Sequence, residues 1–205
     1  MTKIKICGIT RPQDALAVAA AGADAMGLVF YANSSRYVSV EQAQAIVQVL
    51  PPFISSVGLF VNPAPEYVKQ VLAQVPLSCL QFHGQETDEF CQQFGKPYLK
   101  AIHVREDSDV AAMIAHYPKC CGILLDTYVE GSAGGNGLKF NWHKMPQQST
   151  KPIILAGGLT SENVAEAIAL TRPYAVDVSS GVESAPGIKS VEKINAFCQQ
   201  VKTCQ

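Results

Sequence analysis

Eight short apolar runs recur along the 205-residue chain, one for roughly every 25 residues, and this spacing constrains the fold more than any other feature. Most of the runs are rich in β-branched residues and do not alternate between apolar and polar positions. Strands buried on both faces, as in a parallel sheet, have this pattern. The predicted strands are Ile4–Cys7, Met26–Phe30, Val57–Val61, Cys79–Phe82, Tyr98–Ile102, Gly122–Leu125, Ile153–Ala156 and Ala175–Val178.

Segments with helical spacing separate most of these runs. Pro12 suits the first turn of a helix, and Ser161 is the predicted N-cap of another. The Gly-rich, polar segment Thr127–Gly137 has no helical signal and is predicted to be a long exposed loop. The predicted helices are Pro12–Ala21, Val40–Leu50, Pro65–Val75, Ser161–Leu170 and Ser190–Val201, with weaker candidates at Thr87–Phe94 and Ser108–Tyr117.

The alternation of strands and helices predicts parallel βαβ units. Eight such units in a chain of this length fit a small (β/α)₈ TIM barrel, whereas a flavodoxin-like sheet would use only five of them. We expect one domain over residues 1–205, with a weak or missing helix after strand 5 or strand 6.

Composition excludes several functional classes. Charged residues make up 16% of the chain, and 16 Lys and Arg against 17 Asp and Glu leave a net charge of −1, so binding to nucleic acid is not expected. No apolar run reaches the length of a membrane span, and the N-terminal stretch lacks the apolar core of a signal peptide. Seven cysteines without a C-x-x-C pair suggest reduced thiols and a cytoplasmic location.

Small and polar residues concentrate at the predicted strand ends, where such barrels carry their active sites. Two glycine-bearing turns follow strands 7 and 8, and backbone N–H groups in such turns bind phosphate. Ordinary turn glycines are the alternative reading. The predicted phosphate-binding residues are Gly157, Gly158, Ser179, Ser180 and Gly181.

Other strand-end side chains are candidates for chemistry. Cys7 is a possible nucleophile or base, and we expect it to be partly exposed and the fastest thiol to be alkylated. Asp126 before the Gly-rich loop is either a general acid with a raised pKa or a turn residue. Arg36 is either a clamp for a substrate carboxylate or a solvated loop residue. Asp177 lies inside strand 8, so it must be hydrogen-bonded and is expected to orient another side chain or bind a ligand hydroxyl. His83 is either structural or functional.

Metal binding is not predicted. His103, His116 and His143 show no metal-ligand spacing with His83 or with one another.

The ordered set of motifs resembles the phosphoribosylanthranilate isomerase family along essentially the whole chain. The matching stretches are Lys5–Thr10, Gly22–Tyr31, Ser35–Ser39, Val57–Asn62, Leu80–Gly84, Leu124–Thr127, Leu155–Leu159, Val176–Glu183 and Pro186–Lys189.

The resemblance implies an Amadori rearrangement in tryptophan biosynthesis, without a metal or cofactor. Cys7 would be the general base and Asp126 the general acid, while Arg36 would hold the anthranilate carboxylate. His83 and Asp177 would contact a phosphoribosyl substrate whose phosphate lies on the two glycine turns. We expect a monomer or a homodimer.

The chain departs from the family pattern at Ser35, Asn136, Leu138 and Asn141. The residues alone leave three alternatives open. A pentose-phosphate 3-epimerase would share the phosphate turns but use metal-binding histidines, a non-catalytic sensor would bind the phosphoribosyl product without turnover, and an FMN oxidoreductase would be yellow.

Overall fold

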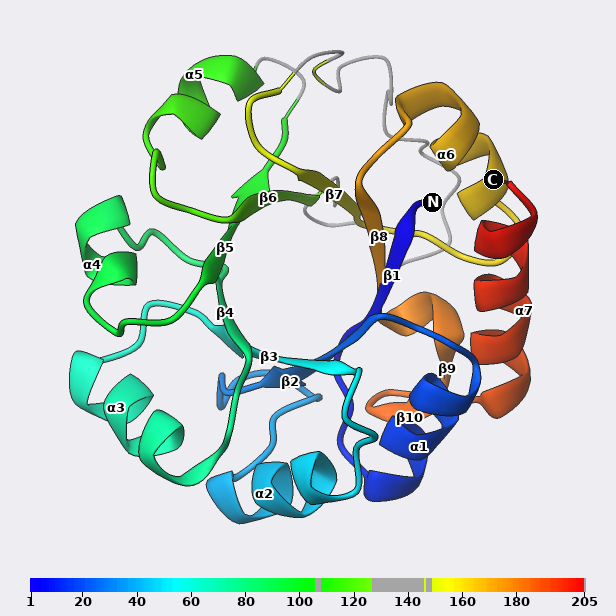
Figure 1. Cartoon of the computed structure of the whole chain (residues 1–205), viewed down its shortest axis with the longest axis horizontal. Helices are drawn as coiled ribbons and strands as arrows, with labels where there is room; N and C mark the ends of the chain where they lie inside the picture. Colours follow the sequence, from blue (N-terminus) through cyan, green and yellow to red (C-terminus); the bar gives the residue numbers. More distant parts are fainter. Residues whose placement is uncertain (106–107, 127–145, 147–148, 205) are drawn as a thin grey trace.

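Eight parallel strands form a closed barrel in which each strand pairs with the next and β8 pairs with β1 (Figure 1). The computed structural model describes residues 1–105, 108–126, 146 and 149–204. The strands are β1 (Lys3–Ile6), β2 (Ala25–Val29), β3 (Ser55–Phe60), β4 (Cys79–Phe82), β5 (Tyr98–His103), β6 (Gly122–Asp126), β7 (Ile153–Ala156) and β8 (Ala175–Val178). The predicted TIM barrel is therefore confirmed, and every predicted strand is present.

Helices surround the barrel, as Figure 1 shows, and most begin where the sequence predicts. Proline occupies the first turn of two helices, and Ser39 and Ser190 each accept a hydrogen bond from a backbone N–H of the helix that follows. The helices are α1 (Pro12–Ala20), α2 (Val40–Gln48), α3 (Pro65–Gln74), α4 (Asp88–Gln92), α5 (Val110–Ala115), α6 (Val164–Thr171) and α7 (Val191–Thr203).

Of the helix boundaries, the start of α6 departs most from the prediction. The N-cap of α6 is Asn163 and not Ser161. The Ser161 hydroxyl donates to Glu162 instead, and the Asn163 side chain accepts from the backbone of Thr160, so a turn precedes the helix.

The helix after β5 is short, with 6 residues, in agreement with the predicted weak helix at this point. The predicted loop Thr127–Gly137 and the family departures Asn136, Leu138 and Asn141 lie outside the described residues.

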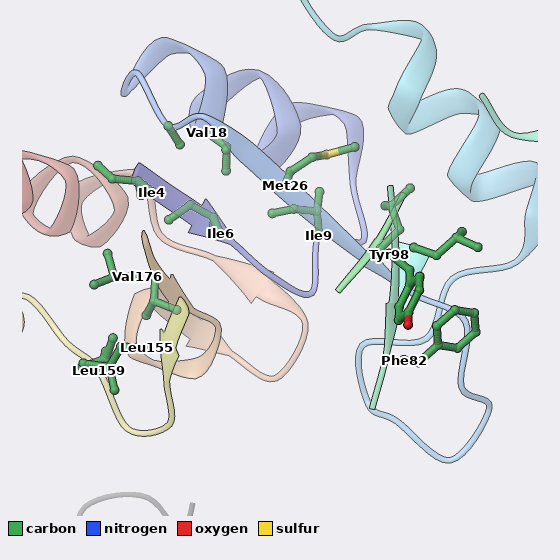
Figure 2. Packing of buried hydrophobic residues seen from close by; sticks show 14 of the residues in the cluster. Ile4, Ile6, Ile9, Val18, Met26, Phe82, Tyr98, Leu155, Leu159 and Val176 are labelled. Atoms are coloured by element: carbon green, nitrogen blue, oxygen red, sulfur yellow. The ribbon is translucent and has the colours of Figure 1, made fainter. Parts of the chain in front are cut away.

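Side chains of successive strand residues enter two different layers. Ile4 and Ile6 belong to the large apolar cluster that also contains Val18 of α1 and Met26 of β2 (Figure 2). Cys7 belongs instead to a small cluster with Val29 and Leu59, and a third cluster is formed by residues such as Leu124 and Ile154. Burial on both faces explains why most strands read as continuous apolar runs.

Polar side chains are also buried along these strands, among them Lys5, Gln81 and Asp177. After β8 the chain forms a short 3₁₀ helix, η2 (Ser180–Val182), and a hairpin of β9 (Glu183–Ala185) and β10 (Ile188–Lys189). Within the described ranges, none of the helices has both the length and the apolarity needed to cross a membrane.

Candidate active site

A cavity of about 360 Å³ lies at the carboxyl ends of the barrel strands. Its volume falls in the range of roughly 300–1,000 Å³ that is usual for small-molecule sites. Every site residue proposed from the sequence lines it, although these residues come from strand ends distributed around the barrel. They are Cys7, Arg36, His83, Asp126, Gly157, Gly158, Asp177, Ser179, Ser180 and Gly181.

Cys7 follows β1 and is buried, with 6% of its surface exposed, so the expectation of a partly exposed thiol is wrong. Burial raises the pKa of the Cys7 thiol, while the ammonium groups of Lys5 and Lys189 act in the opposite direction. A side chain on Gly27 would meet Cys7 Sγ at 2.7 Å and Lys5 Nζ at 3.2 Å. The absence of a side chain at Gly27 therefore leaves room for both groups in the barrel.

Lys5 connects the thiol to strand β8. Its ammonium donates to Asp177 Oδ1 at 2.9 Å, and the two side chains are only 5% and 9% exposed. The Lys5 ammonium also interacts electrostatically with the Cys7 thiol. Burial disfavours the charged amine, but Asp177 and Cys7 together outweigh burial and the pKa of Lys5 is raised. The prediction that Asp177 must be hydrogen-bonded is thus confirmed, and the side chain that it orients is Lys5.

Asp126, the last residue of β6, contacts the histidine that follows β4. His83 Nε2 lies 3.1 Å from Asp126 Oδ2, and both side chains are 18% exposed. The other ring nitrogen of His83, Nδ1, lies 3.1 Å from Nε2 of the Gln81 amide. Since this amide nitrogen can only donate, Nδ1 is the acceptor and Nε2 carries the proton that His83 donates to Asp126.

A second histidine approaches the same carboxylate. His83, His103 and Asp126 each offer one ligand atom, and these atoms all lie within 4.8 Å of one another. The sequence spacing of the histidines gave no sign of this cluster, because neighbouring barrel strands bring together residues that are distant in sequence. Partial desolvation of the His103 ring, which is otherwise exposed, and the proximity of His83 lower the pKa of His103.

Arg36 already holds a carboxylate of this chain. Its Nε and Nη2 atoms donate to the two oxygens of Glu183, each at 2.7 Å, and Lys189 donates to Glu183 at 2.9 Å. The burial of Glu183 works against ionisation, but these two cations outweigh it and lower the pKa of the Glu183 carboxyl. Arg36 thus faces the cavity in a fixed orientation, with further N–H donors besides the two used by Glu183.

The turns after β7 and β8 pack closely together. Gly157 and Gly158 have φ angles of 91° and 65°, which favour glycine. A side chain on Gly181 would stand 2.0 Å from the carbonyl oxygen of Leu159, so only glycine fits there. Ser179 Oγ donates to the carbonyl oxygen of Cys7 at 3.0 Å, which joins this region to the end of β1.

Sequence reasoning did not assign roles to Lys5, Gln81, Glu183 or Lys189. The sequence does contain a signal for Lys5 and Gln81, because residues two apart on a strand point to the same side of the sheet. Lys5 therefore shares a side with Cys7, and Gln81 shares a side with His83. Glu183 and Lys189 belong to the β9–β10 hairpin, whose position against Arg36 cannot be derived from local patterns.

Residues 4–200 match the family described as N-(5'phosphoribosyl)anthranilate (PRA) isomerase. An N-(5'-phosphoribosyl)anthranilate isomerase from Pseudomonas fluorescens Pf-5 is 59% identical over 198 residues, which cover 97% of this chain and 94% of the relative. The chain belongs to this family.

Solved structures of phosphoribosylanthranilate isomerases have the same fold. The enzyme from Thermotoga maritima superposes with a TM-score of 0.92 at 42% identity, covering 99% of this chain and 100% of that one. A second phosphoribosylanthranilate isomerase was solved in complex with reduced 1-(o-carboxyphenylamino)-1-deoxyribulose 5-phosphate. It is 38% identical to this chain with a TM-score of 0.84, and the match covers 99% of this chain and 100% of that one.

The chain is an enzyme and carries out the isomerisation step of tryptophan biosynthesis that defines the phosphoribosylanthranilate isomerases. The family assignment favours this activity over an epimerase, a sensor or a flavin oxidoreductase.

Proposed function

We propose that Cys7 is the general base and Asp126 the general acid when the chain converts N-(5-phosphoribosyl)anthranilate to 1-(2-carboxyphenylamino)-1-deoxyribulose 5-phosphate. One observation carries the proposal: both side chains line the same cavity, from β1 and β6, with β7 and β8 between them. A sugar bound there would have the thiol and the carboxyl on different sides.

The reaction needs a proton at one point of the sugar and a base at another. The Asp126 carboxyl gives its proton to the ribose ring oxygen, the bond from that oxygen to C1 breaks, and an imine forms between C1 and the anthranilate nitrogen. The Cys7 thiolate then removes the proton from C2, which the imine has made acidic. The resulting enaminol gains a proton at C1 and loses its hydroxyl proton to give the ketone, so the product is an isomer of the substrate.

Lys5 has the position to support the thiolate. Burial makes the charged thiolate costly, and the nearby Lys5 ammonium offsets part of that cost. Since Asp177 holds this ammonium at 2.9 Å, the ion pair orients the cation toward the base. The raised pKa of Cys7 leaves the thiolate in the minority at neutral pH, so kcat/KM should rise with pH as Cys7 loses its proton.

The rest of the cavity has the chemistry to bind both ends of the substrate. Arg36 suits the anthranilate carboxylate, because its guanidinium is fixed by Glu183 and keeps further donors. Backbone N–H groups around Gly157, Gly158, Ser180 and Gly181 suit the phosphate. We assign His83 and Asp177 to the sugar hydroxyls.

Kinetics of three variants test the proposal. Cys7→Ala and Asp126→Asn should each lower kcat by about 10²–10⁴-fold, the usual contribution of a general acid or base. Both should still bind the reduced product analogue, because neither change removes the carboxylate or phosphate contacts.

Cys198→Ala is the matched control, since it removes another buried thiol, on α7 and outside the residues that line the cavity. Near-normal turnover in Cys7→Ala or Asp126→Asn would refute the assignment, as would an equal loss in Cys198→Ala.

We further propose that the chain works in the cytoplasm as one domain over residues 1–205, as a monomer or a homodimer with a small phosphoribosyl substrate. Its seven cysteines are free thiols, which suits a reducing compartment. Sedimentation of the purified chain, with and without reductant, distinguishes a monomer from a dimer.

A further inference from the structure

Three potential metal ligands converge at the carboxyl ends of consecutive strands. His83 follows β4, His103 ends β5 and Asp126 ends β6, and His103 is the register partner of Asp126. One ligand atom from each residue lies within 4.8 Å of the other two. Two imidazoles and a carboxylate form a ligand set that binds first-row divalent metals.

The spacing is close to what a metal ion requires. Two ligands at about 2.0–2.1 Å from Zn²⁺ stand about 3.3 Å apart at the tetrahedral angle. His83 Nε2 and Asp126 Oδ2 are 3.1 Å apart, so this pair needs to separate by only a few tenths of an ångström. The rings of His83 and His103 have centroids 5.1 Å apart, and His103 is exposed, which leaves it room to rotate toward an ion.

A buried amide independently points to a ligand. Gln81 is fully buried, and its Oε1 is the buried side-chain atom that has no hydrogen-bond partner among the described residues. A metal on Nε2 of His83 would move the imidazole proton to Nδ1, which faces Gln81 at 3.1 Å. A half-turn of the Gln81 amide would then bring Oε1 to Nδ1–H as acceptor. Metal-bound histidines usually have such a partner for their second ring nitrogen.

We propose that His83, His103 and Asp126 form a binding site for a divalent transition-metal ion, represented by Zn²⁺ or Co²⁺, and that the bound ion inhibits the isomerase. Inhibition follows because a carboxylate that coordinates a cation cannot also carry the proton that ring opening consumes. The metal site stands on geometry alone, whereas its inhibitory effect rests on the proposed role of Asp126.

Cobalt titration of the full chain tests the site without turnover. Co²⁺ should bind with visible d–d absorption and without the near-ultraviolet sulfur-to-cobalt band that thiolate ligands give. His103→Asn should weaken binding by at least about 10-fold, the smallest loss usual even for groups outside the first ligand shell. His116→Asn is the matched control, because His116 caps the far end of α5 and should not affect binding.

Zn²⁺ inhibition is measured on the same proteins. Because His103 does not line the catalytic cavity, His103→Asn should keep wild-type turnover without metal and lose inhibition by Zn²⁺. A chelator should restore activity to the inhibited wild type.

Absence of cobalt binding, equal binding to His103→Asn, or a sulfur-to-cobalt band would each overturn the site. Cobalt bound by the histidines with turnover unchanged would instead overturn the inhibition and count against Asp126 as the general acid.

Discussion

Replacing Lys5 by methionine tests how the barrel interior supports the site. Methionine is similar in length but has no charge, so Asp177 would remain as an unpaired carboxylate in a place where it is 9% exposed. Removing one partner of a buried ion pair costs about 3–5 kcal/mol. For a domain of this size, each kcal/mol lowers Tm by roughly 2–4 °C, so we expect a loss of about 6–20 °C.

The same strand supplies a matched control. Lys3 also pairs with an aspartate, Asp24, at 2.8 Å, but these side chains are 49% and 38% exposed. Because exposed pairs contribute little, Lys3→Met should hardly change Tm. The double variant Lys5→Met/Asp177→Asn should recover part of the lost Tm, because it also removes the unpaired Asp177 carboxylate.

The assay is thermal unfolding at neutral pH, followed by the pH dependence of kcat/KM. Without the Lys5 ammonium the pKa of the Cys7 thiol should rise further, and each unit of rise lowers the thiolate fraction about tenfold at neutral pH. If Lys5→Met has the same Tm as the Lys3→Met control, the stabilising role of the buried Lys5–Asp177 pair is refuted.

Three further predictions concern the remaining site groups. Arg36→Met should raise KM by about 10- to 100-fold with a smaller effect on kcat, because hydrogen bonds to charged groups contribute about 1.5–3 kcal/mol; steady-state kinetics check this. In the free enzyme Cys121 should be alkylated before Cys7, because it is exposed and a hydrogen bond from a neighbouring thiol lowers its pKa to about 7; mass spectrometry of the labelled protein decides, and faster labelling of Cys7 contradicts the burial argument. Gly181→Ala should lose about 1–3 kcal/mol of stability and bind phosphate less tightly, because its new methyl group would stand 2.0 Å from a backbone oxygen; denaturant unfolding and phosphate inhibition measure both effects.

The strands were predictable because each carries its own signal. Cys79–Phe82, Ile153–Ala156 and Ala175–Val178 were predicted with the bounds that the structure has. Burial on both faces makes a strand apolar throughout, and this pattern is readable without knowledge of the partners. The start of α6 was missed because the Ser161 hydroxyl bonds the side chain of its neighbour Glu162. Such a local hydrogen bond competes with N-capping, and the general preference for serine at N-caps does not show it.

The positions of the site residues were predictable from the fold, but their electrostatics were not. The position of Cys7 at a strand end predicts that it reaches the cavity, but it does not predict that Val29 and Leu59 pack against the thiol. The Arg36–Glu183 pair joins residues 147 positions apart through a hairpin that only the tertiary structure places. The approach of His83 to His103 likewise depends on the order of strands in the barrel.

Single-turnover fluorescence tests the central claim, the removal of the C2 proton by Cys7, most directly. Freshly generated phosphoribosylanthranilate, with hydrogen or deuterium at C2 of the sugar, is mixed with excess wild-type or Cys7→Ala protein, and the loss of anthranilate fluorescence is followed. We predict a decay in the wild type that deuterium slows, and a decay in Cys7→Ala that is about 10²–10⁴-fold slower. A Cys7→Ala decay as fast as that of the wild type would contradict the account.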